Sequence, residues 1–442
     1  MDVDQWIPPR ADREVGLGFY ASQSPPVEGR IKEDAEDFRV QEISAYPMPD
    51  PAGTYTVLRV RSRDWEQHEL AQRLSARLGL SPHAISWAGT KDRRAVSERL
   101  FSYRGAPPAR PVDLEGATIV EAYRARDGLV LGHHFGNSFE IRVSQLSLPP
   151  IEAVALFEAT RLQLVDGDGL PNFFGLQRFG EVRPVTHRVG RELVRGDPGA
   201  AVETYLTFVE EGVDGMGVEA RRRYAAEHDA VAALRDLPAA FRFERRLLDH
   251  LARGNGPERA LGSLTRELRR LFVHAYQALL FNRWLDARRN ARIPLGRAEA
   301  GDHLLRRGAD GTIRTLDPIP VVEDNLPEAQ ELVARARAVV AGPLVGYETP
   351  SEDGPVGRLL SQILSDEGVR AQDFRLPKTP ELASAGSWRP AVLPIPPISI
   401  REDAPATSGS VRPGVWFRFS LPRGSYATVL LREFLKAGAT HP

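Results

Sequence analysis

Apolar and polar residues alternate in several short runs that lie toward the two ends of the chain. A period of two residues is typical of a half-buried strand, because successive side chains point to opposite faces of a sheet. The runs that predict strands are 38–43, 54–61, 117–130, 139–143 and 415–420. The strand-rich parts of the chain therefore lie at its two ends.

Leucine and alanine recur at helical spacing through the middle of the chain and between some of the strand runs. The predicted helices are 64–78, 149–164, 327–340, part of 359–376 and 425–436, and residues 186–285 are mainly helical with the strongest pattern at 267–285. Gly79 is a stop signal for the first of these helices, and Ser425 is expected to cap the last. The middle of the chain is therefore helix-rich.

The remaining segments are rich in proline, glycine or polar residues, which favour turns and loops. Residues 1–27 are expected to form an irregular lead-in, 301–319 short strands with turns, 341–350 a loop, and 381–412 a return connection between domains. No repeat of 20 to 50 residues is present, so a solenoid or propeller is not expected.

Length and composition narrow the class of protein. A chain of 442 residues exceeds a single typical core, so two domains are expected. Its 42% hydrophobic and 26% charged residues are typical of a soluble globular protein, and neither a membrane-spanning run nor a signal peptide is expected. The absence of cysteine excludes disulfides, thiolate zinc sites and cysteine nucleophiles. These features together suggest a cytoplasmic protein.

The charge of the chain is balanced overall but unevenly distributed. The net charge of −1 counts mildly against a nucleic-acid binder. Lysine occurs at only four positions, so nearly all basic residues are arginine, and these cluster in 178–195 and 269–297. Arginine is the side chain best suited to forked contacts with phosphate. The distribution of charge therefore keeps an RNA-binding function open.

The stretch 87–103, WAGTKDRRAVSERLFSY, carries the strongest candidate chemistry. Asp92 follows Lys91 and precedes Arg93 and Arg94, so three cations surround one carboxylate. Nearby positive charge favours the ionised form of a carboxylate, which makes Asp92 a candidate nucleophile. A short, charged, glycine-containing turn is also a common solvated surface feature, and the stretch taken alone favours that simpler interpretation.

Several other residues have both a chemical and a structural interpretation. Lys32 stands just before the strand 38–43, where it could be a solvated charge. His133 and His134 are adjacent on a loop with no third ligand nearby, so no metal site is expected. Asn137 could form a turn and Phe139 could pack in a core. The aromatic residues of 171–180 could anchor a loop or stack on bases, and Phe173, Phe174 and Phe179 are expected mainly to pack.

Six sequence blocks, taken together, resemble the TruD family of RNA pseudouridine synthases. The blocks are EDFRVQE, WAGTKDRRAV, LGHHFGNSFEI, LPNFFGLQRFG, HAYQALLFN and LPRGSYATVLLRE, and they follow the order of that family from about residue 29 to residue 436. One block would be weak support, whereas six in order over nearly the whole chain are highly specific.

The resemblance implies an α+β fold. It would consist of a pseudouridine-synthase domain, with a mixed, mostly antiparallel sheet and packed helices, into which a second α/β domain is inserted. In this sequence the catalytic domain would be 28–167 plus 390–442, and the inserted TRUD domain 168–389. Arginine-lined faces would bind RNA, which is compatible with a neutral total charge.

The resemblance also implies the isomerisation of uridine to pseudouridine in tRNA, typically at uridine 13 of the D arm. The glycosidic bond moves from N1 to C5 of the same uracil, so no cofactor and no metal are expected. Asp92 would be the catalytic aspartate, acting on the ribose, the base or a sugar proton. Lys32 would keep Asp92 ionised and orient it.

The remaining site residues are also carried over from the resemblance. Phe139 would stack on the extruded target base, and Asn137 would orient Phe139 or the aspartate loop. Candidates for phosphate or active-site contacts are Lys91, Arg93, Gln177 and Arg178. Arg99, Trp388 and His274 depart from the usual family pattern, although none of them touches the aspartate or the stacking aromatic in that pattern.

Two alternatives stay open from the sequence. The first is a non-catalytic RNA-binding or RNA-folding protein on the same fold, against which the joint presence of Asp92, Lys32 and Phe139 argues. The second is an acid–base hydrolase that uses Asp92 with another carboxylate, although no suitably spaced carboxylate pair is present. The expected partner is tRNA, with other RNAs not excluded, and the expected oligomeric state is a monomer without an obligate protein partner.

Overall fold

The computed structural model describes residues 6–44, 46–109, 112–210, 212, 214–215, 217–308, 311–315, 317–351, 354–403 and 413–436. The chain forms two compact units. Unit 1 comprises residues 1–6, 20–170 and 394–442, and unit 2 comprises residues 7–19 and 171–393. Both units therefore draw on segments that are distant in the sequence.

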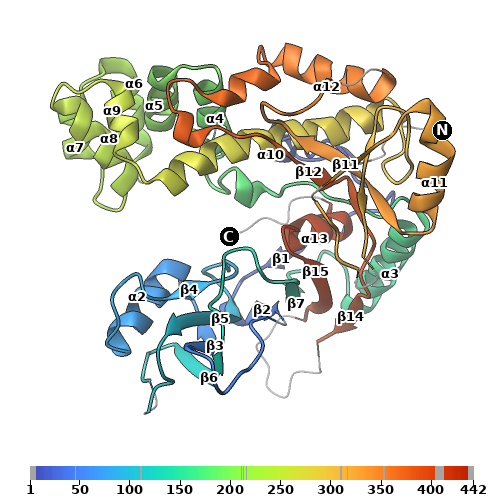
Figure 1. The fold of residues 1–442 in the computed structure, drawn as a ribbon, viewed down its shortest axis with the longest axis horizontal. Coiled ribbons are helices and arrows are strands. Elements are labelled where there is room, and N and C mark those ends of the chain that lie inside the picture. The colour runs from blue at the N-terminus through green and yellow to red at the C-terminus, as the bar shows by residue number, and fades with distance from the viewer. Residues whose placement is uncertain are drawn as a thin grey trace. The chain divides into compact units, whose positions relative to one another are not determined.

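Unit 1 is built on one mixed sheet (Figure 1). The strand order is β14-β15-β7-β2-β5-β3-β6, with β1 added beside β7 and β4 beside β5. The strands are β1 (Arg30–Ile31), β2 (Phe38–Ile43), β3 (Tyr55–Arg63), β4 (Ser86–Trp87), β5 (Val96–Arg104), β6 (Ala117–Ala125), β7 (Gly136–Ser144), β14 (Ser399–Glu402) and β15 (Val415–Pro422). Of the strand pairs in the described residues, β2 with β5 is parallel and the rest are antiparallel. The expectation of a mixed, mostly antiparallel sheet is confirmed.

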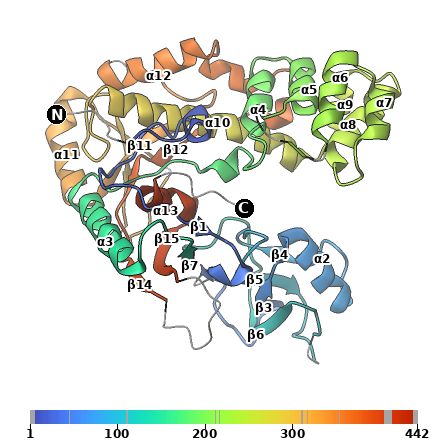
Figure 2. The same cartoon turned by 180° about the vertical axis from the view of Figure 1, so that it is seen from behind.

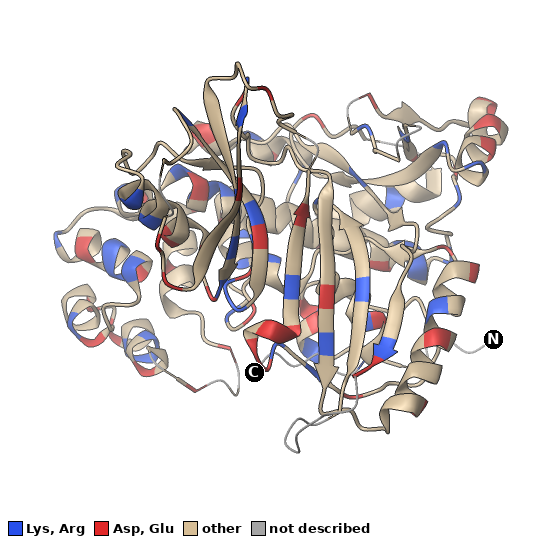
Figure 3. Cartoon of the chain, turned by 90° about the horizontal axis from the view of Figure 1, so that it is seen from below, with Lys and Arg blue, Asp and Glu red and all other residues tan. Residues whose placement is uncertain are grey.

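One face of this sheet carries ion pairs in rows. Glu140 on β7 lies 3.7 Å from Arg39 on β2 and 3.3 Å from Arg418 on β15. Arg59 on β3 lies 3.0 Å from Glu121 on β6 and 3.5 Å from Glu98 on β5. Figure 3 shows basic and acidic bands interleaved along these strands. Cross-strand pairs of opposite charge stabilise a sheet face that is open to water.

Helices cover apolar parts of the sheet. They are η1 (Ala35–Asp37), α2 (Gln67–Arg77), α3 (Pro150–Asp166) and α13 (Ala427–Leu435). Leu70 and Leu74 of α2 pack with Leu58, Val60 and Phe101 of the strands. On the other side of the unit, the rings of Phe157 on α3, Phe417 on β15 and Phe434 on α13 meet with centroids 5.0 to 6.0 Å apart, and α3 and α13 lie side by side (Figure 2).

The N-terminal part of unit 1 is bonded to α13. The backbone amides of Ala21 and Ser22 donate to the carboxylate of Glu433 at 2.8 and 3.2 Å. The ammonium group of Lys436 donates to the carbonyl and the hydroxyl of Ser22 at 2.9 and 2.6 Å. These contacts join residues that are more than 400 positions apart.

Unit 2 is organised around α10 (Arg266–Asn290), a long helix whose middle is almost entirely buried. The other helices are α1 (Arg10–Glu14), η2 (Leu176–Arg178), α4 (Thr186–Val194), α5 (Pro198–Thr207), α6 (Val218–Glu227), α7 (Ala230–Asp236), α8 (Arg242–Ala252), α9 (Pro257–Gly262), η3 (Glu323–Asn325), α11 (Leu326–Ala334), α12 (Gly354–Asp366), η4 (Ala371–Arg375) and η5 (Pro380–Leu382). Helices α4 and α12 pack along α10 (Figure 1). A Cβ on Gly190 of α4 would lie 2.0 Å from the carbonyl of Phe272, so only glycine permits this close approach.

A small antiparallel sheet and a buried amide complete unit 2. The sheet has the order β10-β9-β11-β12, with β9 (His303–Arg306), β10 (Ile319–Pro320), β11 (Ala338–Leu344) and β12 (Ser387–Pro390). Two further short strands are β8 (Leu170–Pro171) and β13 (Val392–Leu393). The side chain of Asn282 on α10 bonds both backbone groups of Phe174 and the carbonyl of Val15 at 2.8 to 3.0 Å. This explains why a polar residue lies in the buried middle of α10.

Several expectations from the sequence are wrong in detail. Residues 338–344 form the strand β11, although the sequence predicted a helix to 340 and then a loop. The helix α13 begins after Tyr426, whose side chain makes no cap bond, so Ser425 is not the cap. The lead-in contains the helix α1. The return connection contains β12, β13 and β14, and its residues 404–412 lie outside the described residues. Tertiary pairing decides these short segments, because their local patterns are weak.

No helix within the described residues is both long enough and apolar enough to cross a membrane. In the same part of the chain, no three histidine, aspartate or glutamate side chains are grouped so that they could hold a metal ion.

Candidate active site

Asp92 lies in the loop between β4 and β5, in unit 1. Its Oδ2 atom accepts a hydrogen bond of 3.0 Å from the Nζ atom of Lys32. About a third of the Asp92 side chain (35%) is exposed, whereas that of Lys32 is 8% exposed. The ammonium group of Lys32 also lies 4.4 Å from the centre of the Phe38 ring. A buried cation therefore holds one oxygen of a carboxylate that remains accessible to solvent.

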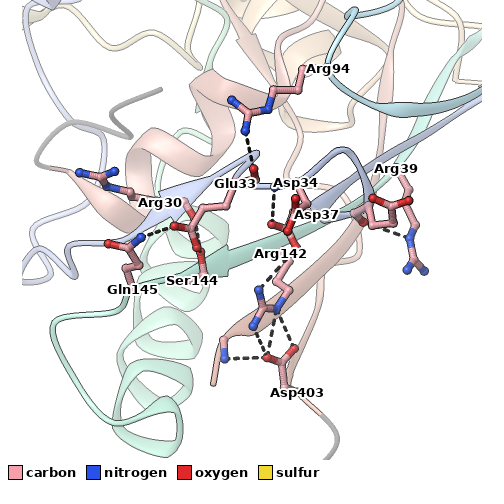
Figure 4. Close-up of polar contacts among 12 residues, drawn as sticks. Arg30, Glu33, Asp34, Asp37, Arg39, Arg94, Arg142, Ser144, Gln145 and Asp403 are labelled. Atoms are coloured by element: carbon pink, nitrogen blue, oxygen red, sulfur yellow. Dashed lines mark hydrogen bonds and ion pairs between the residues drawn. The ribbon is translucent and has the colours of Figure 1, made fainter. Parts of the chain in front are cut away.

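The backbone of Lys32 is in the left-handed region, with φ of 59°. Such a conformation in a residue other than glycine costs on the order of 1–3 kcal/mol and persists where neighbouring contacts impose it. The next residue, Glu33, supplies such contacts (Figure 4). Its carboxylate accepts from the side chains of Ser144 and Gln145, and the Ser144 hydroxyl, ahead of other influences, lowers the pKa of Glu33.

A second group of contacts fixes the chain just after Lys32. The guanidinium of Arg142 on β7 bonds both carboxylate oxygens of Asp403 at 2.7 to 3.1 Å and lies 3.5 Å from Asp37 (Figure 4). Asp37 in turn accepts a 3.0 Å bond from the backbone amide of Asp34. The bend that carries Lys32 is therefore anchored to the sheet on both sides.

Arg94 joins this bend to the aspartate loop. Its guanidinium donates to the backbone carbonyl of Glu33 (Figure 4). Arg94 is two residues after Asp92, and Glu33 is one residue after Lys32. The bend that carries Lys32 and the loop that carries Asp92 are therefore joined by a second contact, from the Arg94 side chain to the backbone of Glu33.

Lys91 makes a separate, buried ion pair. Its Nζ atom lies 2.8 Å from the Oε2 atom of Glu42 on β2, and the two side chains are 3% and 0% exposed. Burial lowers the pKa of Lys91, and the charge of Glu42 opposes this shift. The Oε1 atom of Glu42 is buried and makes no hydrogen bond within the described residues. The ammonium group of Lys91 therefore lies inside the protein, beside the candidate nucleophile, and does not project into solvent.

Arg99 on β5 adds a further buried cation to this region. Its residue is 1% exposed, and its guanidinium donates to the hydroxyls of Ser97 and Ser62 and to the side-chain oxygen of Gln67. Burial lowers the pKa of Arg99 to about 10, opposed by the charges of Glu42, Glu66 and Asp92. Arg99 therefore adds a buried positive charge that acts on Asp92.

Phe139 and Asn137 lie on the inner side of β7. In the antiparallel register Phe139 faces Val40 and Phe419, and Asn137 faces Glu42. The Phe139 ring packs against the rings of Phe38 and Phe419 at 6.1 and 5.5 Å, and the residue is 7% exposed. A base could therefore reach only the part of the ring that its two neighbours leave uncovered.

Asn137 and His134 each place an unbonded atom near Glu42. Within the described residues, Asn137 Oδ1 and His134 Nδ1 are buried and have no hydrogen-bond partner. Burial lowers the pKa of His134, and Glu42 opposes this shift, whereas Lys91 and Arg423 reinforce it. A Cβ built on Gly89 would lie 2.7 Å from Lys91 Nζ, 3.1 Å from Glu42 Oε2 and 3.2 Å from His134 Cε1. These groups therefore form one compact cluster.

The other predicted site residues lie elsewhere. Arg93 is exposed on the aspartate loop. Gln177 and Arg178 belong to η2 in unit 2, where the Arg178 guanidinium lies 5.8 Å from the Phe174 ring. Charges on Arg178 and Arg270 add to burial in lowering the pKa of His274 to about 4. The phenylalanines at 173, 174 and 179 are buried, as the packing interpretation expected.

The sequence did not assign a site role to Glu42, and it indicated Arg94 only as a cation close to Asp92. A signal for Glu42 was present, because it follows Phe38 and Val40 on one face of an alternating strand. A carboxylate on an otherwise apolar strand face requires a buried partner. The partner of Arg94 had no signal in the sequence, since its bond is to a main-chain carbonyl.

Comparison with known proteins places this site in a family. The family model for tRNA pseudouridine synthase D (TruD) matches residues 14–434. A protein of Halobacterium salinarum named probable tRNA pseudouridine synthase D is 37% identical over 437 residues, covering 96% of this chain and 97% of that protein. One of the same name from Methanococcoides burtonii is 34% identical over 435 residues, covering 97% and 98%.

A solved structure gives the same result for the fold. The crystal structure of TruD from Methanosarcina mazei is similar with a TM-score of 0.80 and 31% identity, covering 98% of this chain and 99% of that one. The expected TruD fold, with its mixed sheet and packed helices, is confirmed. The chain belongs to the TruD family of tRNA pseudouridine synthases.

Proposed function

We propose that the protein is a tRNA pseudouridine synthase that acts on uridine 13 of the D arm, with Asp92 as the nucleophile. The family and the 3.0 Å contact between Lys32 Nζ and Asp92 Oδ2 support this proposal. A carboxylate that is held by a buried cation and whose side chain is about a third exposed meets the needs of a nucleophile or of a base. The reaction breaks the C1′–N1 bond, forms a C1′–C5 bond, and moves one proton from C5 to N1, so it needs no external reactant.

The residues around Asp92 would divide the remaining tasks. Lys32 neutralises the carboxylate and fixes its direction. Phe139, with Asn137 beside it, would hold the extruded uracil, and such stacking can offset part of the cost of unstacking the base. Arg93 on the loop, and Gln177 and Arg178 in unit 2, are candidates for contacts with the RNA. The burial of Lys91 against Glu42 favours an active-site role for Lys91 over a phosphate contact.

The catalytic proposal is tested by pseudouridine mapping on an unmodified tRNA transcript. We expect wild type to convert one uridine, and Asp92→Asn and Asp92→Ala to convert none at any enzyme concentration that saturates the RNA. Asp166→Asn is the matched control, because Asp166 is an exposed aspartate at the end of α3 in the same unit. Activity of Asp92→Ala equal to that of wild type would refute the assignment of the nucleophile.

The same experiment separates the alternative function and the target position. If wild type binds the transcript but forms no pseudouridine, the protein is an RNA-binding protein on this fold. A transcript with cytidine at position 13 should give no product, and product elsewhere would refute the proposed position. The affinity for RNA should fall steeply between 50 and about 200 mM salt if phosphates are contacted.

A further inference from the structure

Exposed apolar side chains gather where the strand β7 begins, next to the candidate active site. Leu131 and Phe135 are 68% and 54% exposed, and both lie in the segment 130–135 that leads into β7. Single exposed apolar residues are ordinary, whereas a group of them often marks a binding surface. Within the described residues two phenylalanines are exposed, and Phe135 is more exposed than the other, Phe243 in unit 2.

Main-chain bonds hold this segment to three other parts of unit 1. The amide of Gly132 donates to the carbonyl of Ala88 at 2.7 Å. The amide of Phe135 donates to the carbonyl of Ile43 on β2 at 2.9 Å, and the carbonyl of Phe135 accepts from the amide of Arg423, also at 2.9 Å. The guanidinium of Arg423 donates to the carbonyl of Gly132. The backbone of the segment is therefore fixed while its apolar side chains remain exposed to solvent.

Two further rings lie beside the segment or within it. His133 is exposed, and its ring centre lies 6.3 Å from that of Tyr46, which is exposed as well. The hydroxyl of Tyr46 bonds the carboxylate of Asp127, which restricts the direction of the tyrosine ring. Ile43, the last residue of β2, adds an exposed aliphatic side chain. Aromatic and aliphatic side chains therefore reach solvent from two segments that are bonded to each other.

This surface is continuous with the candidate active site. Phe135 is followed directly by Gly136 and Asn137 at the start of β7. Ala88, which accepts the bond from Gly132, begins the loop that carries Asp92. The surface therefore borders the site on the side of β7 and on the side of the aspartate loop.

We propose that the segment 130–135, together with Ile43 and Tyr46, is a stacking surface for unpaired bases of the RNA strand beside the target uridine. Extrusion of a uridine removes a stacking partner from its neighbours, and aromatic faces can replace that partner whatever the base. Arg423 is exposed at the edge of the surface and supplies positive charge for backbone phosphates. This inference rests on the proposed function and adds to it the residues that hold the strand next to the target.

The position of the surface favours RNA over a protein as its occupant. A partner protein or a second copy of the chain seated here would border the site that the RNA has to enter. Surfaces that bind single-stranded RNA combine exposed rings with basic side chains, as this one does. Because the main chain of the segment is already fixed, binding would order few additional groups and so cost little conformational entropy.

Phe135→Ala tests the proposal, because it removes an exposed ring and should leave the fold intact. We expect the Kd for an unmodified tRNA transcript to rise about 5- to 50-fold, as for the loss of one stacked base. Phe135→Tyr keeps a ring and should bind as wild type does, whereas Phe135→Leu should bind nearly as weakly as Phe135→Ala. Phe243→Ala is the matched control and should bind as wild type does. Wild-type affinity of Phe135→Ala or of Phe135→Leu would overturn the proposal.

A photochemical crosslink locates the contact without turnover. A 5-iodouridine, which crosslinks to a stacked aromatic ring, is placed on each side of the uridine that mapping identifies, or of uridine 13 if none is converted. The Asp92→Asn protein is then irradiated with each transcript. We expect the crosslinked peptides to contain Tyr46, His133 or Phe135. Crosslinks confined to other segments would overturn the proposal.

These measurements separate a failure of this inference from a failure of the proposed function. Crosslinks to the surface, with no pseudouridine formed by wild type, would support the surface and refute the catalytic proposal. Pseudouridine formation with unaltered RNA affinity in Phe135→Ala would refute the surface alone. A dimer in sedimentation that Phe135→Ala abolishes would assign the surface to a second copy of the chain, and would also overturn the inference.

Discussion

Two buried ion pairs, one in each unit, show how similar burial can accompany different degrees of hydrogen bonding. Arg288 and Asp302 in unit 2 are both 0% exposed, and Lys91 and Glu42 in unit 1 are 3% and 0% exposed. A histidine is associated with each pair, the buried His303 as the chain neighbour of Asp302 and the half-buried His134 beside Glu42. The pairs differ in how completely their remaining polar atoms are bonded.

The pair in unit 2 is bonded on all sides. The guanidinium of Arg288 donates to both oxygens of Asp302 and to the carbonyls of Pro294 and Arg297. Asp302 also accepts 2.8 Å from the amide of Glu299. By contrast, Glu42 Oε1 makes no hydrogen bond within the described residues. The same is true there of Asn137 Oδ1 and His134 Nδ1. Fully bonded pairs hold a fold together, whereas the incompletely bonded one lies at the candidate site.

The largest expected effect is a loss of stability when the fully bonded pair in unit 2 is broken. Asp302→Asn leaves Arg288 as a buried charge without a counter-ion, which should lower the free energy of unfolding by about 3–5 kcal/mol. Glu42→Gln, the matched change in unit 1, should cost less, about 1–3 kcal/mol, because fewer bonds are lost. Urea unfolding of both variants measures the difference. Equal losses, or a kcat reduced by Asp302→Asn in the folded protein, would contradict the contrast.

A second prediction uses the histidine beside Asp302. His303 stacks on Trp388 at 3.9 Å, and burial lowers its pKa to about 4. The unfolded chain therefore binds a proton before the folded protein does, and stability is lost as pH falls from about 6.5 toward 4, by roughly 3 kcal/mol at most. His303→Gln should flatten this slope, measured by unfolding between pH 7 and about 4.

Other histidines limit how much of the pH dependence of stability can be due to His303. Burial also lowers the pKa of His187 to about 3 and, together with nearby arginines, that of His274 to about 4, so part of the slope should remain in His303→Gln. His83, which is exposed, provides the control change to glutamine and should leave the slope as it is in wild type. An unaltered slope in His303→Gln would show that His303 takes up its proton equally well in both states.

The smallest effect on stability is expected at Gly89, behind the pair in unit 1. A methyl group there would press on Lys91 Nζ, the far end of a flexible side chain, so the cost in unfolding free energy should be at the low end for overpacking, about 1 kcal/mol. The rate should nevertheless fall, because Lys91 is displaced from its ion pair with Glu42. Gly262→Ala, with no atom within 4 Å of the added carbon, is the control. A rate equal to that of wild type would show that the position of Lys91 is not critical.

Strongly periodic helices and strands could be predicted from the sequence. The strands and side chains with which they pair could not. The strand 38–43 has the predicted bounds, and α10 contains the whole predicted helix 267–285. The strand 338–344 was missed because pairing with β9 and β12 stabilises it, and that pairing is not encoded in its neighbours. The resemblance named Lys32 and Asp92, which the structure brings together. It did not name Glu42, because only the structure shows that its buried partner is Lys91.

The sheet that carries Asp92 is built from strands that come before and after residues 171–393 in the sequence. Strand β7 lies between β2 and β15, and the ring of Phe419 on β15 covers the Phe139 ring. A ribosome releases β7 first and β15 only after residues 171–393 have been translated. Unit 2, if it folds as domains generally do during synthesis, will form while one edge of β7 still lacks its strand. Nascent chains that stop before residue 415 therefore expose that edge and the phenylalanines, which makes them targets for chaperones and for proteolysis.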